Sequence, residues 1–273
     1  MSIRRKVFTG LARLGELSQK ASRAFLYLGA GMLRLEDFDE MTRRSWGAFA
    51  ENDAEIRSGL NPWEETTYRQ FVKAGERLCI VGCGSGRDLL PFVNSGHDVV
   101  VIEPSPQPVA ALRRILREHH RSATIIEDTI ENAVLPGLFD VVLFPYNCYS
   151  CIPGSDRIAV LRKVARHLNP DGRVLVTYVR RNADWVNRSV KLAALTGWLT
   201  RSDWHLEPYD AIQQLHVEGK TVVTYDHFFA PRDVERETEH AGLRVHVHGE
   251  PWSTPFAVLV TDSPDRFDAH PRS

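Results

Sequence analysis

"LCIVGCGSGRDL", residues 78–89, is the stretch that decides the fold class of this chain. An apolar run leads into three glycines, Gly82, Gly84 and Gly86, and charged residues follow. A strand-to-helix turn of this kind lets backbone N–H groups come close to a bound ligand. The dinucleotide fingerprint G-x-G-x-x-G needs its third glycine at position 87, which is Arg87 here. The spacing therefore argues against a nicotinamide oxidoreductase, although a catalytically inactive nucleotide-fold binding protein stays open.

β-rich apolar runs and helical patterns alternate from residue 77 onward. The run DVVVIE (98–103) is almost continuously β-branched, which is typical of a strand buried on both faces of a parallel sheet. This order predicts an α/β fold, a doubly wound and mostly parallel Rossmann-like sheet with helices on both faces. Ligands of such sheets bind at the carboxyl ends of the strands. The other expected strands lie at 77–81, 123–126, 139–144, 172–179, 243–248 and 256–261.

The alternation stops between residues 181 and 230. DWVNRSVKLAALTGWL (184–199) has a helical pattern, and IQQLHVEGKTVVTYDHFF (212–229) reads as a hairpin that turns near Glu218-Gly219. We expect this insertion to form a helix-plus-hairpin cap over the substrate. The predicted organisation is an N-terminal helical extension or lid (1–70), a main domain (71–262) that carries the cap at about 181–230, and a C-terminal tail (263–273).

The N-terminal segment 1–32 is strongly basic, with six Lys and Arg residues against one acid, Glu16. Its apolar residues recur at steps of three or four, which predicts an amphipathic helix. Because Arg13 interrupts the apolar run, a cleaved signal peptide is not expected. We expect the helix to pack on the domain with a solvated basic face. The alternatives are a targeting segment or a helix in peripheral contact with an anionic membrane.

Composition narrows the class of protein further. The net charge is -1 and the pI is about 6.8, so the chain has no overall attraction for nucleic acid. Four cysteines without a secretory leader fit a reducing compartment, and the cytoplasm is the predicted location. No stretch approaches the roughly 18 to 20 uninterrupted apolar residues of a membrane-spanning helix.

A carboxylate closes the second expected strand. Glu103 lies seventeen residues after Gly86, and an acid at this place can accept hydrogen bonds from both hydroxyls of a ribose. A solvated acid at a strand end is the alternative interpretation.

With these residues in view, the chain resembles the class I S-adenosylmethionine-dependent methyltransferases. The resemblance rests on CIVGCGSGRDLLPFVNSGHDVVVIEPSP (79–106), IIEDTIENA (125–133), FDVVLFPYNCYSCIP (139–153) and LRKVARHLNPDGRVLVTYV (161–179). It covers about residues 75–180, with a looser echo at 231–261. It implies S-adenosyl-L-methionine as the cofactor.

The resemblance also assigns roles to single residues. The loop of Gly82, Cys83, Gly84 and Gly86 would face the methionine end of the cofactor. Glu103, followed by Pro104, would bind the ribose. Asp128, followed by Thr129, would meet the adenine amino group, and Phe144 to Asn147 would line the methyl-transfer pocket.

Two departures from the family pattern matter. The acid that is common just before the first glycine is replaced by Val81, so the methionine amino group would rely on backbone carbonyls alone. LFPYN (143–147) is not the Asn/Asp-Pro-Pro-aromatic signature of adenine and cytosine amino-methyltransferases. Amino methylation of nucleic acid is therefore disfavoured.

Methyl transfer asks for alignment, and only hydroxyl-type acceptors need a base. His227, at the return of the predicted hairpin, is the first candidate for a catalytic base. Other candidates for the acceptor pocket are Asn147, Tyr149, Tyr178 and Asp210, with His205 also considered. Each of these could equally be a structural residue.

The four cysteines form two pairs, Cys79 with Cys83 and Cys148 with Cys151. A thiolate zinc site is conceivable because the first and fourth strands of this fold are neighbours. However, Cys79 should point into the sheet, and an ion at Cys83 would block the cofactor loop. Reduced, buried thiols are the prediction, and no metal is expected.

The sequence thus predicts a methyltransferase that acts on a small-molecule or a lipid- or sugar-linked acceptor. An RNA or protein methyltransferase is the alternative, because basic residues and tryptophans accompany the segment 180–204. The balanced total charge favours a small molecule over nucleic acid. The oligomeric state cannot be read from the sequence.

Overall fold

The computed structural model describes residues 3–47, 59–181, 185–217, 219–250 and 254–261. Within them a seven-stranded sheet has the order β3-β2-β1-β4-β5-β10-β9. The first five of these strands are parallel, whereas β10 runs antiparallel to both β5 and β9. The prediction of a doubly wound, mostly parallel sheet is confirmed. The strands are β1 (Arg77–Val81), β2 (Asp98–Ile102), β3 (Thr124–Ile126), β4 (Phe139–Phe144), β5 (Leu168–Thr177), β9 (Leu243–Gly249) and β10 (Phe256–Thr261).

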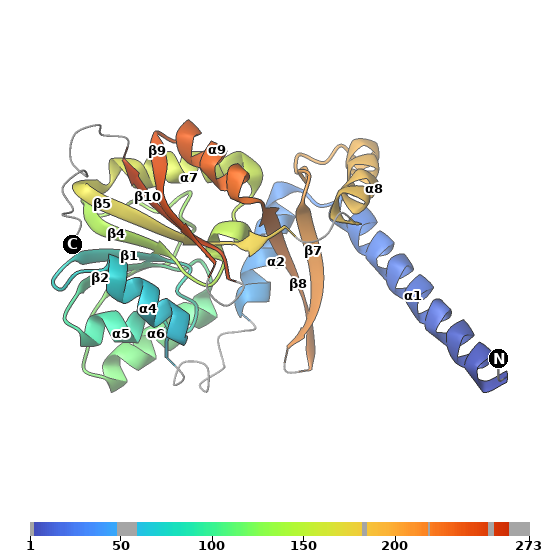
Figure 1. Ribbon diagram of the computed structural model, residues 1–273, viewed down its shortest axis with the longest axis horizontal. Coiled ribbons are helices and arrows are strands. Elements are labelled where there is room, and N and C mark those ends of the chain that lie inside the picture. The colour runs from blue at the N-terminus through green and yellow to red at the C-terminus, as the bar shows by residue number, and fades with distance from the viewer. Residues whose placement is uncertain (1–2, 48–58, 182–184, 218, 251–253, 262–273) are drawn as a thin grey trace, which may run out of the picture.

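Helices cover both faces of the sheet (Figure 1). Because side chains alternate along a strand, Leu78 and Ile80 enter one core and Cys79 and Val81 enter the other. One face packs against α4 (Pro62–Phe71), α5 (Leu89–Asn94) and α6 (Pro106–Glu118). The opposite face packs against α7 (Gly154–Arg166) and α9 (Pro231–His240).

A second, three-stranded sheet stands beside the first and has the order β6-β8-β7. Val217 pairs with Lys220, so the hairpin turns between these two residues, as the sequence predicts. The helix α8 (Trp185–Thr200) precedes this hairpin. The strands are β6 (Val179–Arg180), β7 (Asp210–Val217) and β8 (Lys220–Phe229).

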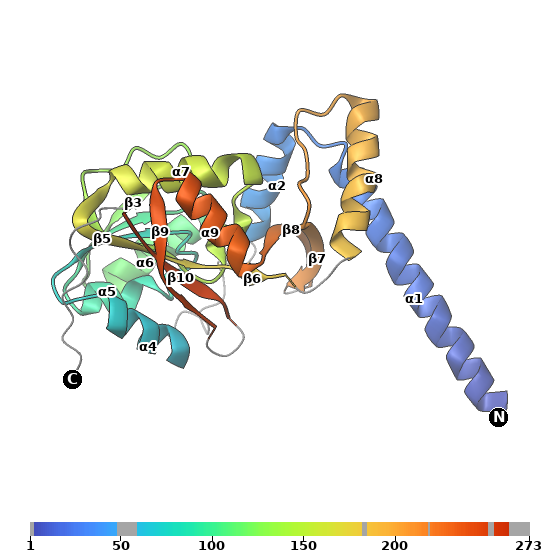
Figure 2. The same cartoon turned by 45° about the horizontal axis from the view of Figure 1, so that its top comes forward.

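The N-terminal helices belong to the same unit as the insertion. Phe38 of α2 (Leu35–Gly47) stacks on Trp204 at 4.3 Å between ring centroids and meets the edge of Tyr225 on β8. Tyr27 of α1 (Ile3–Ala30) is buried in this third core, and its hydroxyl group donates to the carbonyl of Asp210. Helices α1 and α2 and the insertion thus form one cap, as Figure 2 also shows, whereas α4, which was expected to belong to the extension 1–70, packs on the seven-stranded sheet.

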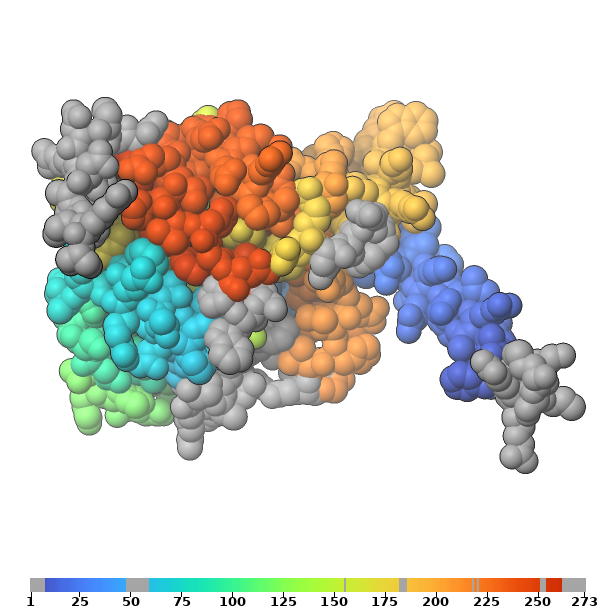
Figure 3. All heavy atoms as spheres, viewed as in Figure 1, coloured from blue at the N-terminus to red at the C-terminus, as the bar shows by residue number. Residues whose placement is uncertain are grey.

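Helix α1 departs from the expectation that it packs on the domain along its length. Every residue from Gly10 to Ser22 is exposed, and only the C-terminal end around Tyr27 and Ala30 is buried. Figure 3 shows the helix projecting beyond the rest of the molecule. Among the described helices, α1 included, none has both the length and the hydropathy needed to span a bilayer. The predicted tail, residues 263–273, lies outside the described residues.

Candidate active site

The glycine loop at the carboxyl end of β1 has a backbone path that requires glycine. Gly82, Gly84 and Gly86 have φ angles of 72°, 56° and 104°, in the left-handed region that L side chains rarely adopt. A Cβ atom on Gly82 would lie 2.6 Å from the Sγ atom of Cys148. The loop therefore passes closely beneath the chain that leaves β4.

Glu103 ties this loop to the end of β2. Its buried carboxylate accepts hydrogen bonds from the N–H groups of Gly84 and Ser105, at 3.0 Å each. Burial raises the pKa of Glu103, and the hydrogen bonds from Ser105 and Gly84 oppose that rise. Each carboxylate oxygen keeps a second lone pair for a ribose hydroxyl. The geometry therefore fits the role that the sequence predicts for this residue.

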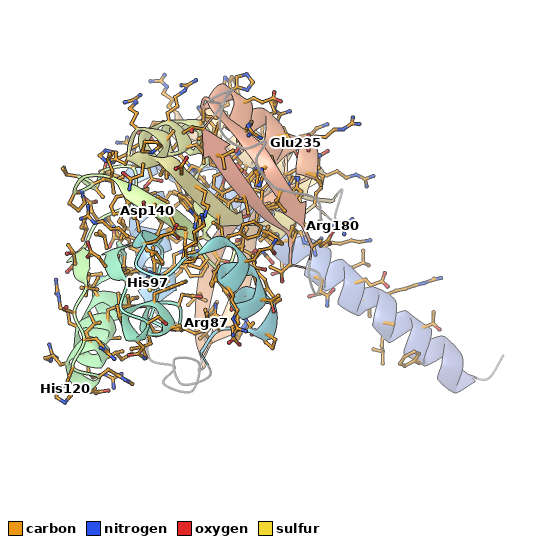
Figure 4. All side chains as sticks on the ribbon, turned by 60° about the vertical axis from the view of Figure 1, so that its left-hand side comes forward. Arg87, His97, His120, Asp140, Arg180 and Glu235 are labelled. Atoms are coloured by element: carbon orange, nitrogen blue, oxygen red, sulfur yellow. The ribbon has the colours of Figure 1, made fainter. Side chains whose placement is uncertain are left out.

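A buried ion-pair cluster supports the loop from below. The guanidinium of Arg87 donates two hydrogen bonds to Glu64 of α4, at 2.7 and 2.8 Å, and also contacts Asp88. Figure 4 shows Arg87 beside α4. Burial lowers the pKa of Arg87, but Asp88 and Glu64 outweigh this effect and hold it above its ordinary value. We did not predict this cluster, because 23 residues separate Glu64 from Arg87.

The predicted adenine site is placed beyond β3. Asp128 is half-buried there, and its Oδ1 atom accepts the N–H of Thr129 at 2.8 Å. Pro104, next to Glu103, is also only partly covered. A contact of these residues with adenosine stays a prediction.

Two predicted cofactor contacts are corrected at the side-chain level. The side chain of Cys83 is buried in the core on the α4 side, and that of Phe144 is buried against the edge of Tyr149. Only the backbone of these two residues can reach a ligand in the cleft.

Tyr149 and Tyr178 do not line the predicted acceptor pocket. Tyr149 is fully buried, stacks on Phe229 and donates its hydroxyl hydrogen bond to Glu237 at 2.6 Å. The hydroxyl group of Tyr178, also buried, is 2.8 Å from Nε2 of His248. Both tyrosines follow apolar strands and pack into the core between the sheet and α9. The prediction that they line the acceptor pocket is therefore wrong.

His227 and Asp210 are brought together, on neighbouring strands of the hairpin. Nδ1 of His227 lies 2.7 Å from Oδ1 of Asp210, which also accepts a hydrogen bond from Tyr225. Both residues are buried, and the imidazole ring packs on Phe229 at 4.5 Å. Asp210 fixes the orientation of the imidazole, and its carboxylate oxygens are already engaged by His227, Tyr225 and the N–H of Glu207.

His205 lies elsewhere. It lines a hollow of about 680 Å³ between the end of α1 and α8, together with Gly31 and Trp198. This hollow is formed by the far side of the cap and contains none of the glycine-loop residues.

The other face of the hairpin presents a polar wall that the sequence did not reveal. We define this wall as Gln213 of β7 with Thr224 and Asp226 of β8, which share one face by register. Asp226 accepts a hydrogen bond from the side-chain amide of Gln213 at 3.1 Å and a longer one from the thiol of Cys151 at 3.9 Å. Burial raises the pKa of Asp226 to about 7, despite these two hydrogen bonds. The residue is nevertheless only partly covered in the structure.

The short 3₁₀ helix η1 (Cys148–Cys151) joins this polar wall to the glycine loop. The thiol of Cys148 donates to the carbonyl of Gly82 at 3.2 Å, while Cys151 contacts Asp226. Asp226 is therefore separated from the glycine loop by one turn of helix. This is the end of the loop where the methionine part of the cofactor is expected.

Two buried polar atoms in this region have no hydrogen-bond partner among the described residues. They are Oδ1 of Asn147 and Oγ1 of Thr224. Asn147 has a left-handed backbone, with φ of 66°, and its N–H donates to Thr177. Because unsatisfied buried polar groups are rare in folded proteins, these atoms point to a ligand that completes their hydrogen bonds. That Asn147 lines the methyl-transfer pocket stays a prediction.

The cysteines do not form a metal centre in the described part of the chain. No group of three or more His, Cys, Asp or Glu residues there is arranged to hold an ion. Burial raises the pKa of Cys79 to about 12 and that of Cys148 still further, which disfavours the thiolates that zinc requires. That the protein binds no metal stays a prediction.

Part of this chain is similar to known proteins. Residues 80–174 match the model of a methyltransferase domain. The ubiquinone biosynthesis O-methyltransferase of Bradyrhizobium sp. (strain ORS 278) is 26% identical over 157 residues, which are 55% of this chain and 60% of that protein. The chain thus spans about three fifths of the length of these curated relatives.

Solved structures share the fold at low identity. An S-adenosylmethionine-dependent methyltransferase from Clostridium acetobutylicum ATCC 824 superposes with a TM-score of 0.58 at 12% identity, over 76% of this chain and 95% of its own. The CcbJ methyltransferase from Streptomyces caelestis gives 0.59 at 15% identity, over 80% and 98%. At these identities, both structures show a similar fold and nothing more.

Proposed function

We propose that this chain, whose residues 80–174 are a methyltransferase domain on the class I S-adenosylmethionine-dependent fold, transfers a methyl group to a hydroxyl group of a small molecule. The observation that carries the proposal is the buried Glu103 carboxylate, held between Gly84 and Ser105 at the mouth of the glycine loop. It presents free lone pairs where a ribose is expected, beside a loop that only glycine can form. The sequence family and the matching folds support the same cofactor.

When bound, S-adenosylmethionine would supply the methyl group, and its sulfur would keep the electron pair of the broken carbon–sulfur bond. Glu103 would hold the ribose, and the backbone of the glycine loop would hold the methionine part. Asn147, whose Oδ1 atom lacks a partner among the described residues, would accept a hydrogen bond from the bound molecules. These groups orient the reactants, which is the main contribution a protein makes to this reaction.

Asp226 is the base that the geometry favours for a hydroxyl acceptor. It would take the proton that the hydroxyl group loses as the new oxygen–carbon bond forms. A pKa of about 7 lies near the operating pH, where a general base works best. His227 is enclosed on the other face of the hairpin and is farther from η1 in the hydrogen-bond network. The relative named above is an O-methyltransferase, which agrees with this choice.

The cap (α1 and α2 with the insertion 181–230) would enclose the acceptor, which could be free or attached to a lipid or sugar. A groove of about 540 Å³ lies between α2 and the first residues of β8, Thr221 to Val223. Arg180 pairs with Glu250, and Arg181 pairs with Asp233, so both guanidinium groups already have an acidic partner. This pairing favours a small molecule over RNA. The cytoplasm stays the predicted compartment.

Replacing Glu103 tests the proposed cofactor site. We expect Glu103→Ala to weaken binding of S-adenosylhomocysteine, measured by calorimetry, by about 1.5 to 3 kcal/mol, the range for hydrogen bonds to a charged group. Glu103→Gln keeps the shape but can accept only through one oxygen, so an intermediate loss is expected.

Glu118→Gln is the matched control for this measurement. Glu118 is exposed near the end of α6 and pairs with Arg114 on the same helix, so its loss should change the affinity by less than about 0.5 kcal/mol. Equal affinity of Glu103→Ala and the unaltered protein would show that the ribose is not bound here.

A further inference from the structure

Helix α1 carries an apolar stripe that no described part of the protein covers. We define the α1 stripe as the exposed side chains of Leu11, Leu14, Leu17 and Phe25. Leu14 is 63% exposed and Phe25 is 73% exposed. Leu14 and Phe25 are eleven residues apart, which is close to three full turns, so both lie on one side of the helix.

The stripe is directed away from the core of the cap. Tyr27, which anchors α1 by hydrogen bonds with the backbone of Asp210 and Ile212, follows Phe25 by two residues. Residues two apart on a helix point in nearly opposite directions. The helix therefore packs through one side and leaves its most apolar side in water. Packing within this chain does not explain the stripe.

Exposed apolar residues on α8 extend the surface. Leu195, Trp198 and Leu199 are exposed, and Trp198 is 76% exposed. The hydroxyl group of Thr196 donates to the carbonyl of Leu28, which fixes this part of α8 against the end of α1. Figures 1 and 2 show the two helices side by side at the end of the molecule remote from the seven-stranded sheet.

The charge of α1 indicates what covers this surface. Its sequence contains six basic residues and one acidic residue, whereas the rest of the chain has 28 basic and 34 acidic residues. Two copies of such a helix repel one another, but an anionic surface attracts it. A basic polar side with Leu and Phe on the other side is typical of a helix that lies in the plane of a bilayer interface. An exposed tryptophan favours the same location.

We propose that the α1 stripe, with Leu195, Trp198 and Leu199 of α8, docks the protein on an anionic lipid bilayer. The helix lies flat at the interface rather than spanning it, consistent with the absence of a described helix suited to span a bilayer. The glycine loop and Asp226 take no part in this contact, so docking and methyl transfer can be tested separately.

The test uses the full chain and vesicles of phosphatidylcholine with about 30% phosphatidylglycerol, which give the negative surface potential of a cytoplasmic leaflet. We expect the protein to co-sediment with these vesicles and to bind neutral vesicles much more weakly. Leu14→Asp/Leu17→Asp should lower the apparent affinity for anionic vesicles at least about tenfold, because two exposed leucines no longer enter the interface. Higher salt should weaken binding of the unaltered protein.

Val134→Asp is the matched control, since this apolar residue is 87% exposed and lies on the main domain, away from α1. It should bind vesicles like the unaltered protein. Retained affinity for S-adenosylhomocysteine shows that each variant is folded. Absence of vesicle binding would overturn the proposal, as would equal binding by the stripe variant and the control. A concentration-dependent dimer in sedimentation that the stripe variant abolishes would assign the surface to a second copy instead, and would also overturn it.

Discussion

Asp226→Asn should reduce the rate of methyl transfer about 100- to 10,000-fold, the usual contribution of a positioned general base. Asparagine has nearly the same shape and can still accept the hydrogen bond from Gln213, but it cannot take a proton. The affinity for S-adenosylhomocysteine should stay unchanged, because Asp226 borders the expected acceptor site. Isotope-labelled methyl transfer to the acceptor, once identified among molecules retained by the purified protein, measures the effect.

The pH dependence adds a second readout. Asp226 has to be ionised to act as a base, and its pKa is raised to about 7 by burial. For the unaltered protein, kcat/KM should therefore be low below neutral pH and should rise as the pH passes about 7. Loss of this rise in Asp226→Asn, with residual activity independent of pH near 7, would assign the titration to this carboxyl group.

Stability should change in the opposite direction to activity. The folded-state pKa of Asp226 lies above the ordinary value of 3.8, so the folded state holds its proton more tightly than the unfolded state. The stabilisation that this provides is complete below pH 3.8 and is lost as the pH rises through about 7. Above that pH, Asp226→Asn should unfold at a higher denaturant concentration than the unaltered protein. The gain should be at most about 4 kcal/mol by linkage.

His227→Gln separates the two candidates for the base. If Asp226 is the base, this variant keeps the rise of kcat/KM near pH 7 and loses activity mainly through disturbed packing against Phe229. The reverse result, in which His227→Gln removes the rise and Asp226→Asn retains it, would return the role to the histidine predicted from the sequence.

Arg87→Met should destabilise the protein by about 3 to 5 kcal/mol in urea unfolding. The substitution removes the guanidinium that lies between Glu64 and Asp88, and both of these acids are buried. Removing one partner of a buried ion pair leaves the other partner as an uncompensated buried charge, which strongly destabilises the folded state. Because Arg87 directly follows Gly86, the glycine loop should also loosen and bind S-adenosylhomocysteine less well.

Helix α4, which carries Glu64, offers the control for this prediction. Arg69 and Glu65 form an ion pair on α4 one turn apart, and both side chains are exposed. Arg69→Met should therefore cost less than about 1 kcal/mol. If the two substitutions lowered the free energy of unfolding by similar amounts, the Arg87 cluster would not stabilise the glycine loop in the way that its burial indicates.

The fold was predictable where local signals are strong. β-branched runs with glycine or proline at their ends gave the strands of the parallel sheet, and the pair Glu218-Gly219 gave the hairpin turn. The glycine spacing and Glu103 likewise predict where the cofactor binds. These features depend on residues close together in sequence, whose conformation is limited by their own chemistry.

The acceptor side was not predictable in the same way. Asp226 looks like an ordinary polar residue in a strand, and its pKa is raised to about 7 only by burial in the folded protein, where Cys151 from a distant segment contacts it. Tyr149 was wrongly assigned to the pocket because a contact with a distant helix was not visible in the sequence. It follows β4 as expected, but its hydroxyl group donates a hydrogen bond to Glu237 of α9. Contacts between segments 75 or more residues apart decided both cases.

The central claim is that the glycine loop and Glu103 form an S-adenosylmethionine site, and calorimetry on the unaltered protein tests it most directly. We expect S-adenosylhomocysteine to bind with a stoichiometry of about one per chain, and we expect no heat of binding from NAD, because Arg87 stands where the dinucleotide fingerprint needs a glycine. Binding of NAD without binding of S-adenosylhomocysteine would contradict the account.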